Sequence, residues 1–138
     1  MDQQLVEEKL EALRHCVQRV QDKCPASVDG LMNDSDIQDI VSVNLTRAVQ
    51  LCVDISAHLI SESNEIPPSS MAGSFDALQR MGVIDAEICR QMKRAVGFRN
   101  VAVHQYQAVD WNIVFAICTT NIDDFRSFAS AISRHLHL

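Results

Sequence analysis

Apolar residues recur at steps of three and four along the first part of the chain, which is the repeat of one face of an α-helix. The first stripe predicts a helix from about residue 2 to residue 24 that ends before Pro25. Its members are Val6, Leu10, Leu13, Val17 and Val20. A polar loop is expected around residues 27–30, followed by a long helix capped within residues 33–35. The stripe of this helix consists of Ile37, Ile40, Val41, Leu45, Ala48, Cys52, Ile55 and Leu59.

The second half of the chain continues the helical pattern after an interruption. Residues 61–70 include two prolines among serines and predict a crossing loop. Ser74 is expected to cap a short helix that Gly82 ends. Asp85 is expected to cap the next helix, with inward residues Ile88, Met92, Val96 and Val103. Asp110 then precedes a last amphipathic helix, whose apolar face is Trp111, Val114, Ile117, Ile122, Phe125, Phe128 and Ile132.

These elements predict an all-α fold, an up-and-down four-helix bundle with a short extra helix. The chain has 138 residues, of which 47% are hydrophobic, so it can close one core and is too short to divide comfortably into two. We therefore expect a single domain over residues 1–138.

Composition limits the kinds of RNA contact and the cellular compartment that we expect. The formal charge is 12 minus 18, or −6, and there is no polybasic arm, so any contact with RNA must be local. The five cysteines stand far apart without a CxxC pair, which indicates a reducing compartment and favours the cytoplasm. Charged residues and histidines interrupt the apolar stretches, so no membrane span is expected. No Gly-rich phosphate loop is present, and no cofactor is expected.

The segment KRAVGFRNVAVHQY, residues 93–106, places polar groups inside an apolar pattern. On an ideal helix Lys93, Gly97, Asn100 and His104 lie within about 60° of one another and form one stripe. Within this stripe we expect Lys93 and Gly97 to support the site or to contact RNA. Gly97 costs roughly 1 kcal/mol of helix stability relative to Ala, so something other than helix propensity favours it.

Arg99 lies about 140° from His104 on the same ideal helix, so the two cannot stack as neighbours. They can meet through the long arginine side chain, through a distorted turn, or across a homodimer. A two-fold axis is the favoured solution, because it would bring two arginines and two histidines to one cleft. That set suits metal-free cleavage of RNA, in which one imidazole takes the 2′-OH proton and the other protonates the 5′-oxygen. The guanidinium groups would stabilise the charge on the phosphorane, and Asn100 could orient the imidazole of His104 or bind phosphate.

The run from Arg99 to Tyr106, RNVAVHQY, resembles the RX4HXY signature of HepT proteins, a minimal HEPN family. Three stretches, the last of which contains this run, agree with the family in order and spacing: DIVSVNLTRAVQLCVDISAHLI, FDALQRMGVID and MKRAVGFRNVAVHQY. The resemblance implies a homodimeric toxin of a type VII-like toxin–antitoxin system, with a composite ribonuclease site at the dimer interface. It also implies an MntA-like nucleotidyltransferase antitoxin that silences the nuclease by AMPylation of the motif tyrosine. Here that residue is Tyr106, the only tyrosine in the chain.

Other candidate residues have simpler interpretations. His135 and His137 form an HxH at the end of the chain, but without a third nearby ligand we expect no metal site. The aspartates at 36 and 39 describe a helix start and a solvated face, whereas the position of Asp54 relative to the motif helix is open.

Two other functions stay open on the sequence. The acidic charge favours a catalytically silent subunit that presents RNA or a protein to the nucleotidyltransferase. A purely structural helical adaptor ranks last, because it would leave the polar stripe without a purpose.

Overall fold

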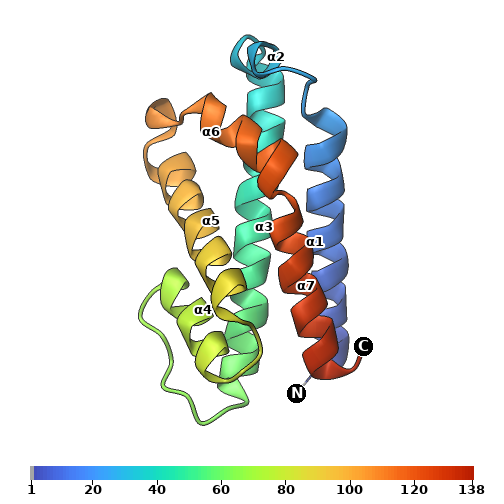
Figure 1. Cartoon of the computed structure of the whole chain (residues 1–138), viewed down its shortest axis with the longest axis vertical. Helices are drawn as coiled ribbons and strands as arrows, with labels where there is room; N and C mark the ends of the chain where they lie inside the picture. The colour runs from blue at the N-terminus through green and yellow to red at the C-terminus, as the bar shows by residue number, and fades with distance from the viewer. Residues whose placement is uncertain (1) are drawn as a thin grey trace.

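The computed structural model describes residues 2–138, and every regular element in this range is helical (Figure 1). The long helices α1, α3, α5 and α7 span Gln3–Lys23, Ser35–Ser61, Ala86–His104 and Asp123–Leu136. The shorter elements are α2 (Val28–Met32), α4 (Met71–Arg80), η1 (Tyr106–Ala108), α6 (Trp111–Ala116) and η2 (Ile117–Asn121). Helix α1 packs along α3, α4 packs on α3 and α5, and α7 lies against α5 and α1. The predicted all-α bundle is confirmed.

Most predicted helix starts are confirmed by side-chain caps. Asp34 accepts hydrogen bonds from the first backbone N–H groups of α3, and Asp85 accepts one from Ile88 N at 2.8 Å. Asp110 caps α6 in the same way. Gly82 follows α4 with φ of 76°, a left-handed conformation that glycine adopts without strain.

Three local predictions are wrong. Helix α4 is capped by Ser70, which accepts from Gly73 N at 3.0 Å, and Ser74 is buried inside the helix. The polar segment 27–30 belongs to the short helix α2, since Ser27 caps it. The last helix is interrupted at residues 117–121 by a π-helical turn.

One cluster of buried hydrophobic residues is shared by the four long helices. At its centre Phe75 of α4 meets Phe128 of α7 edge to face, with ring centroids 5.8 Å apart. The predicted inward residues Ile88, Met92 and Val96 of α5 are buried. Val103, also predicted to face inward, is 48% exposed because it lies beyond the part of α5 that the bundle covers.

Among the described residues, α3 is the one helix that is long and apolar enough to cross a membrane, by length and composition alone. Half of the most apolar 18-residue segment of this helix is buried inside the bundle, as in the core helix of a globular domain. Arg47 and Asp54 lie within this helix and interrupt its apolar stretch.

Candidate functional site

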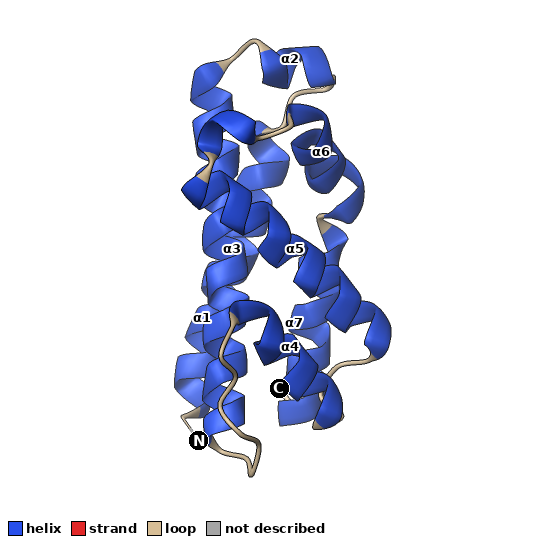
Figure 2. Ribbon diagram, turned by 90° about the vertical axis from the view of Figure 1, so that its left-hand side faces the viewer, coloured by secondary structure: helices blue, strands red, loops and turns tan. Residues whose placement is uncertain are grey.

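The outer surface of α5 carries the polar stripe expected from the sequence. Met92 and Val96 anchor the helix in the core, whereas Gly97, Asn100 and His104 are exposed. Helix α5 runs along the outside of the bundle toward the end at which α6 lies (Figure 2). The predicted stripe thus faces outward from the protomer.

Arg99 and His104 do not meet within one protomer. The guanidinium Nη1 of half-buried Arg99 donates to Asn100 Oδ1 over a long 3.4 Å. His104 is the last residue of α5, and its imidazole forms no hydrogen bond or ion pair with any residue in the range 2–138. Both of its ring nitrogens are therefore free to meet a ligand or another chain.

Lys93, at the end of the stripe away from His104, forms an ion pair with another helix. Its Nζ lies 3.0 Å from Oδ1 of Asp76 on α4, and this contact lowers the pKa of Asp76 and raises that of Lys93. Eleven residues of helix, about 16 Å, separate Lys93 from His104. The structure thus brings Lys93 together with α4 and not with the motif residues.

Tyr106 begins the turn η1 directly after α5 and folds back onto α3. Its hydroxyl group donates to Asp39 Oδ1 at 2.8 Å, and its ring meets Trp111 edge to face with centroids 5.8 Å apart. Burial, followed by the hydrogen bond to Asp39, raises the pKa of Tyr106, and the hydroxyl group of Ser42 opposes this shift. At neutral pH the phenol is therefore protonated.

Asp39 is the residue that the sequence reasoning missed. The sequence predicts that Asp39 lies on a solvated face, and the residue is indeed exposed. Its carboxylate, however, also accepts a hydrogen bond from the motif tyrosine. Periodicity within α3 gave no signal for this role, because the partner is 67 positions away.

Gly97 opens onto a groove between α5 and α6. A Cβ atom built at this position would meet nothing within 4 Å, so packing inside the protomer does not require glycine. The groove has a volume of about 360 Å³ and is lined mainly by apolar side chains, including Phe98, Val101 and Ile113. Ile113 is 56% exposed beside it.

Asp54 takes no part in this surface. It accepts from Gln50 at 2.9 Å and lies 3.7 Å from Nζ of Lys9 on α1, which answers the question left open by the sequence. Among residues 2–138 no group of three potential metal ligands comes together, and His135 and His137 are exposed near the end of the chain.

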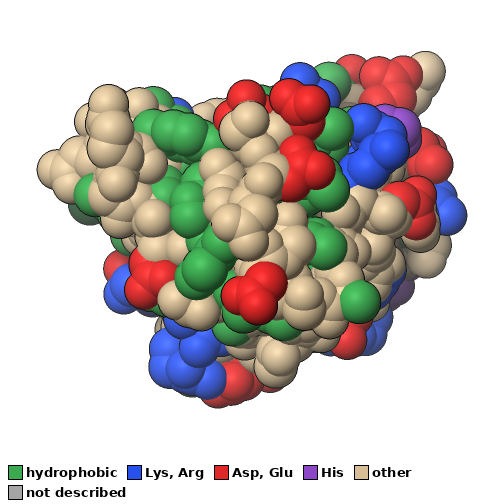
Figure 3. Space-filling model, turned by 90° about the horizontal axis from the view of Figure 1, so that it is seen from above, with side chains coloured by type: hydrophobic (Ala, Val, Ile, Leu, Met, Phe, Trp, Pro, Cys, Tyr) green, Lys and Arg blue, Asp and Glu red, His purple; other side chains and the backbone are tan. Residues whose placement is uncertain are grey.

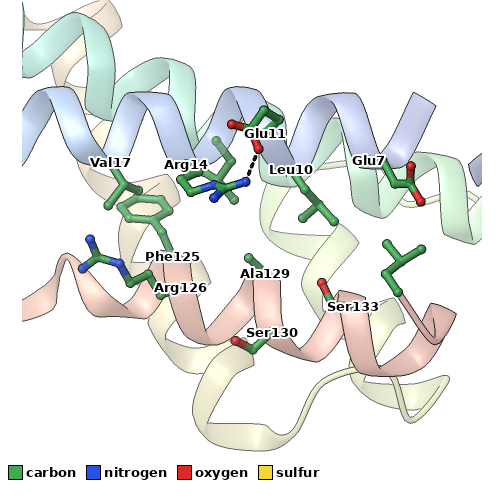
Figure 4. Close-up of a pocket in the computed structure, with 12 residues that line it drawn as sticks. Glu7, Leu10, Glu11, Arg14, Val17, Phe125, Arg126, Ala129, Ser130 and Ser133 are labelled. Carbon is green, nitrogen blue, oxygen red and sulfur yellow. Dashed lines mark hydrogen bonds and ion pairs between the residues drawn. The ribbon is translucent and has the colours of Figure 1, made fainter. Parts of the chain in front are cut away.

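A larger groove of about 560 Å³ lies between α1 and α7, away from α5 (Figure 4). Leu10, Val17, Phe125 and Ala129 form its apolar part, and an ion pair between Arg14 and Glu11 lies at its edge. It contains none of the motif residues.

The end of the bundle near α2 and α6 has no concentrated positive charge. In the view from above, acidic side chains lie near the middle of the face and basic side chains lie toward its edges (Figure 3). This agrees with the net charge of −6 and favours local contacts with any RNA.

Comparison with known proteins places the chain in a family. Residues 13–132 match the sequence model of the family described as Ribonuclease HepT-like. The mRNA nuclease HepT of Shewanella oneidensis is 30% identical over 124 residues, 90% of this chain and 92% of the relative. The tRNA nuclease HepT of Aphanizomenon flos-aquae is 22% identical over 132 residues, which are 96% of this chain and 90% of that protein.

Solved structures of toxin–antitoxin complexes are also similar to this chain. A tri-AMPylated HEPN toxin of Shewanella oneidensis in complex with MNT antitoxin superposes with a TM-score of 0.89 at 28% identity, over 97% of this chain and 99% of that chain. A toxin–antitoxin structure with AMP-PNP gives 0.88 at 28% identity, over 96% and 99% of the two chains. On the match of the family model to most of its length, this chain belongs to the HepT-like ribonuclease family.

Proposed function

We propose that this chain is the toxin of a toxin–antitoxin pair and cuts RNA without a metal at a composite site formed by two copies. Arg99, Asn100 and His104 are the candidate catalytic residues. The observation that carries the proposal is the outward-facing end of α5, where the imidazole of His104 has no partner among residues 2–138 of its own protomer.

The chemistry needs an acid and a base on opposite sides of the scissile phosphate. One imidazole removes the proton of the ribose 2′-OH, whose oxygen attacks phosphorus. The bond from phosphorus to the 5′-oxygen breaks, and the second imidazole protonates that oxygen, leaving a 2′,3′-cyclic phosphate. Arg99 would stabilise the added negative charge of the phosphorane.

A homodimer supplies the second histidine. The groove beside Gly97 is lined mainly by apolar side chains, and Ile113 in its lining is 56% exposed. Apolar side chains exposed together are typical of a surface that another chain covers. The same contact would place Gly97 where a second backbone could approach closely.

The antitoxin is proposed to be an MntA-like nucleotidyltransferase that transfers AMP to Tyr106. Two solved relatives support this pairing, since one is a tri-AMPylated toxin in complex with MNT antitoxin and the other is a complex with MntA. A phosphodiester two residues from His104 would add negative charge and a bulky nucleoside where the RNA phosphate must bind. We further propose that the protein acts in the cytoplasm, because its five cysteines are unpaired and four of them are buried.

RNA cleavage by the purified protein tests the nuclease assignment. His104→Ala is expected to abolish cleavage while leaving the helical circular dichroism spectrum and the dimer in place. His135→Ala is the matched control, because His135 is also exposed but lies near the C-terminus, outside the motif. Full activity of His104→Ala would contradict the assignment.

The acidic surface favours one alternative function, a catalytically silent subunit that presents RNA or a protein to the nucleotidyltransferase. This alternative predicts that the wild-type dimer cleaves no RNA at any salt concentration, even when Tyr106 is unmodified.

A further inference from the structure

The carboxylate of Asp39 holds the hydroxyl group on which the proposed modification would occur. The phenolic O–H of Tyr106 donates to Asp39 Oδ1 across 2.8 Å. Asp39 lies on the exposed face near the start of α3, whereas Tyr106 begins the turn that follows α5. The pair therefore forms only because the end of α5 folds back onto α3.

The other neighbours of the phenol are neutral. Trp111 of α6 packs against the ring, and the buried hydroxyl group of Ser42 on α3 lowers the pKa of the phenol. Among residues 2–138, Asp39 is thus the ionisable side chain in contact with this oxygen. Because the environment raises the pKa of Tyr106, the phenol keeps its proton at neutral pH and is a weak nucleophile until a base removes it.

We propose that Asp39 is the base that accepts the phenolic proton when a nucleotide is transferred to Tyr106. The inference rests on the proposed function, since it assumes that Tyr106 is the acceptor. A distance of 2.8 Å lies within the range over which a general base acts directly. The carboxylate belongs to the acceptor chain, so this chain would contribute a catalytic group to its own modification.

The step balances with a nucleoside triphosphate that the partner enzyme binds. The oxygen of Tyr106 attacks the α-phosphorus, and a new oxygen–phosphorus bond forms. The bond from the α-phosphorus to the oxygen bridging it to the β-phosphate breaks, and pyrophosphate leaves with the electron pair. The phenolic proton moves to Asp39 Oδ1, and because Asp39 is exposed, it returns this proton to water.

The test measures the rate at which a purified MntA-like nucleotidyltransferase transfers label to this chain from ATP labelled in its α-phosphate. Asp39→Asn keeps the length of the side chain and an oxygen that can accept the phenolic hydrogen bond, but it cannot take up the proton. We expect incorporation to fall about 100-fold or more, the usual contribution of a general base. Asp36→Asn, which neutralises an exposed aspartate one turn earlier on α3, is the matched control and is expected to react like the wild type.

The pH dependence separates proton removal from simple positioning. As the pH rises from 7 toward the pKa of the phenol, hydroxide ionises Tyr106 without help, so the rate of Asp39→Asn relative to wild type should rise with pH. Asp39→Glu, which keeps a carboxylate, should recover part of the lost rate. A ratio that does not change with pH, or an asparagine variant that reacts like the wild type, would overturn the proposal.

Failure of the underlying function gives a different result. If the wild type takes up no label, or if Tyr106→Phe is labelled as well as the wild type, then Tyr106 is not the acceptor, and the proposed modification falls together with the role of Asp39. Thermal unfolding of each variant shows whether its fold is retained. If Asp39→Asn does not fold, the comparison of Asp39→Glu with the wild type decides, and a 100-fold loss in a folded glutamate variant would count against the proton transfer.

Discussion

Lys93 of α5 forms an ion pair with Asp76 of α4, with 3.0 Å between Nζ and Oδ1. The pair joins the short helix to the start of the polar stripe. Asp76 also accepts a weak hydrogen bond from the thiol of Cys89, so its carboxylate has two donors. Lys93 therefore has a structural partner, and its proposed contact with RNA would have to compete with it.

Lys93→Ala is expected to lower the free energy of unfolding only slightly, because both side chains of the ion pair are more than 40% exposed to water. The hydrogen bond from Lys93 lowers the pKa of Asp76, so the stabilisation is present above about pH 4 and is lost as the pH falls through the lower folded-state value. Urea unfolding of the wild type and Asp76→Asn at several pH values tests this. The difference between them should shrink below about pH 4, and a difference that grows there would contradict it.

Gly97→Ala should separate the stability of the protomer from assembly of the site. Because the added methyl group meets no atom within 4 Å, the variant should gain helix stability of about 1 kcal/mol. Its melting temperature should rise by roughly 3–5 °C. If a second copy approaches this glycine, sedimentation should show a weaker dimer and RNA cleavage should fall. Unchanged assembly and cleavage would show that the glycine serves no close contact.

Phe128→Ala should be the most damaging of the substitutions considered. The ring is completely buried and meets Phe75, so its removal leaves a cavity that costs about 3–5 kcal/mol. That is a large part of the roughly 5–15 kcal/mol that stabilises a typical domain. Ile66→Ala, at a residue that is 82% exposed, provides the control and should leave the urea midpoint unchanged.

Asp85→Ala removes the cap of the helix that carries the motif. Its carboxylate accepts from Ile88 N at 2.8 Å, and loss of such a cap costs about 1 kcal/mol. Asp85→Asn keeps a capping oxygen and should lose much less. Thermal melts of the two variants check the difference, and equal losses would mean that the charge at the helix start matters more than the hydrogen bond.

Local signals in the sequence determined most helix limits. The caps at Asp34, Asp85 and Asp110 were predictable because a side chain that binds a backbone N–H two or three residues away needs no distant partner. The predicted cap at Ser74 is wrong because burial in the bundle, and not a local hydrogen bond, determines where this residue lies. It looks like a cap in the sequence, but an earlier serine, Ser70, caps the helix and the bundle buries Ser74.

The motif stripe was likewise predictable, since helical periodicity alone places Gly97, Asn100 and His104 on one side of α5. Their exposure follows from the apolar residues on the other side of the helix. Periodicity and local caps are therefore enough to specify the fold class, the helix that carries the motif and the side of that helix on which the polar groups lie.

The partners of these groups depend instead on how the helices pack against one another. The contact between Asp39 and Tyr106 joins residues 67 positions apart, and the pair of Lys93 with Asp76 depends on how α4 packs against α5. Neither contact follows a helical repeat, because each depends on the angle and height at which two helices meet. Those are set by the shape of the whole core, and a pattern read along one helix contains no information about them.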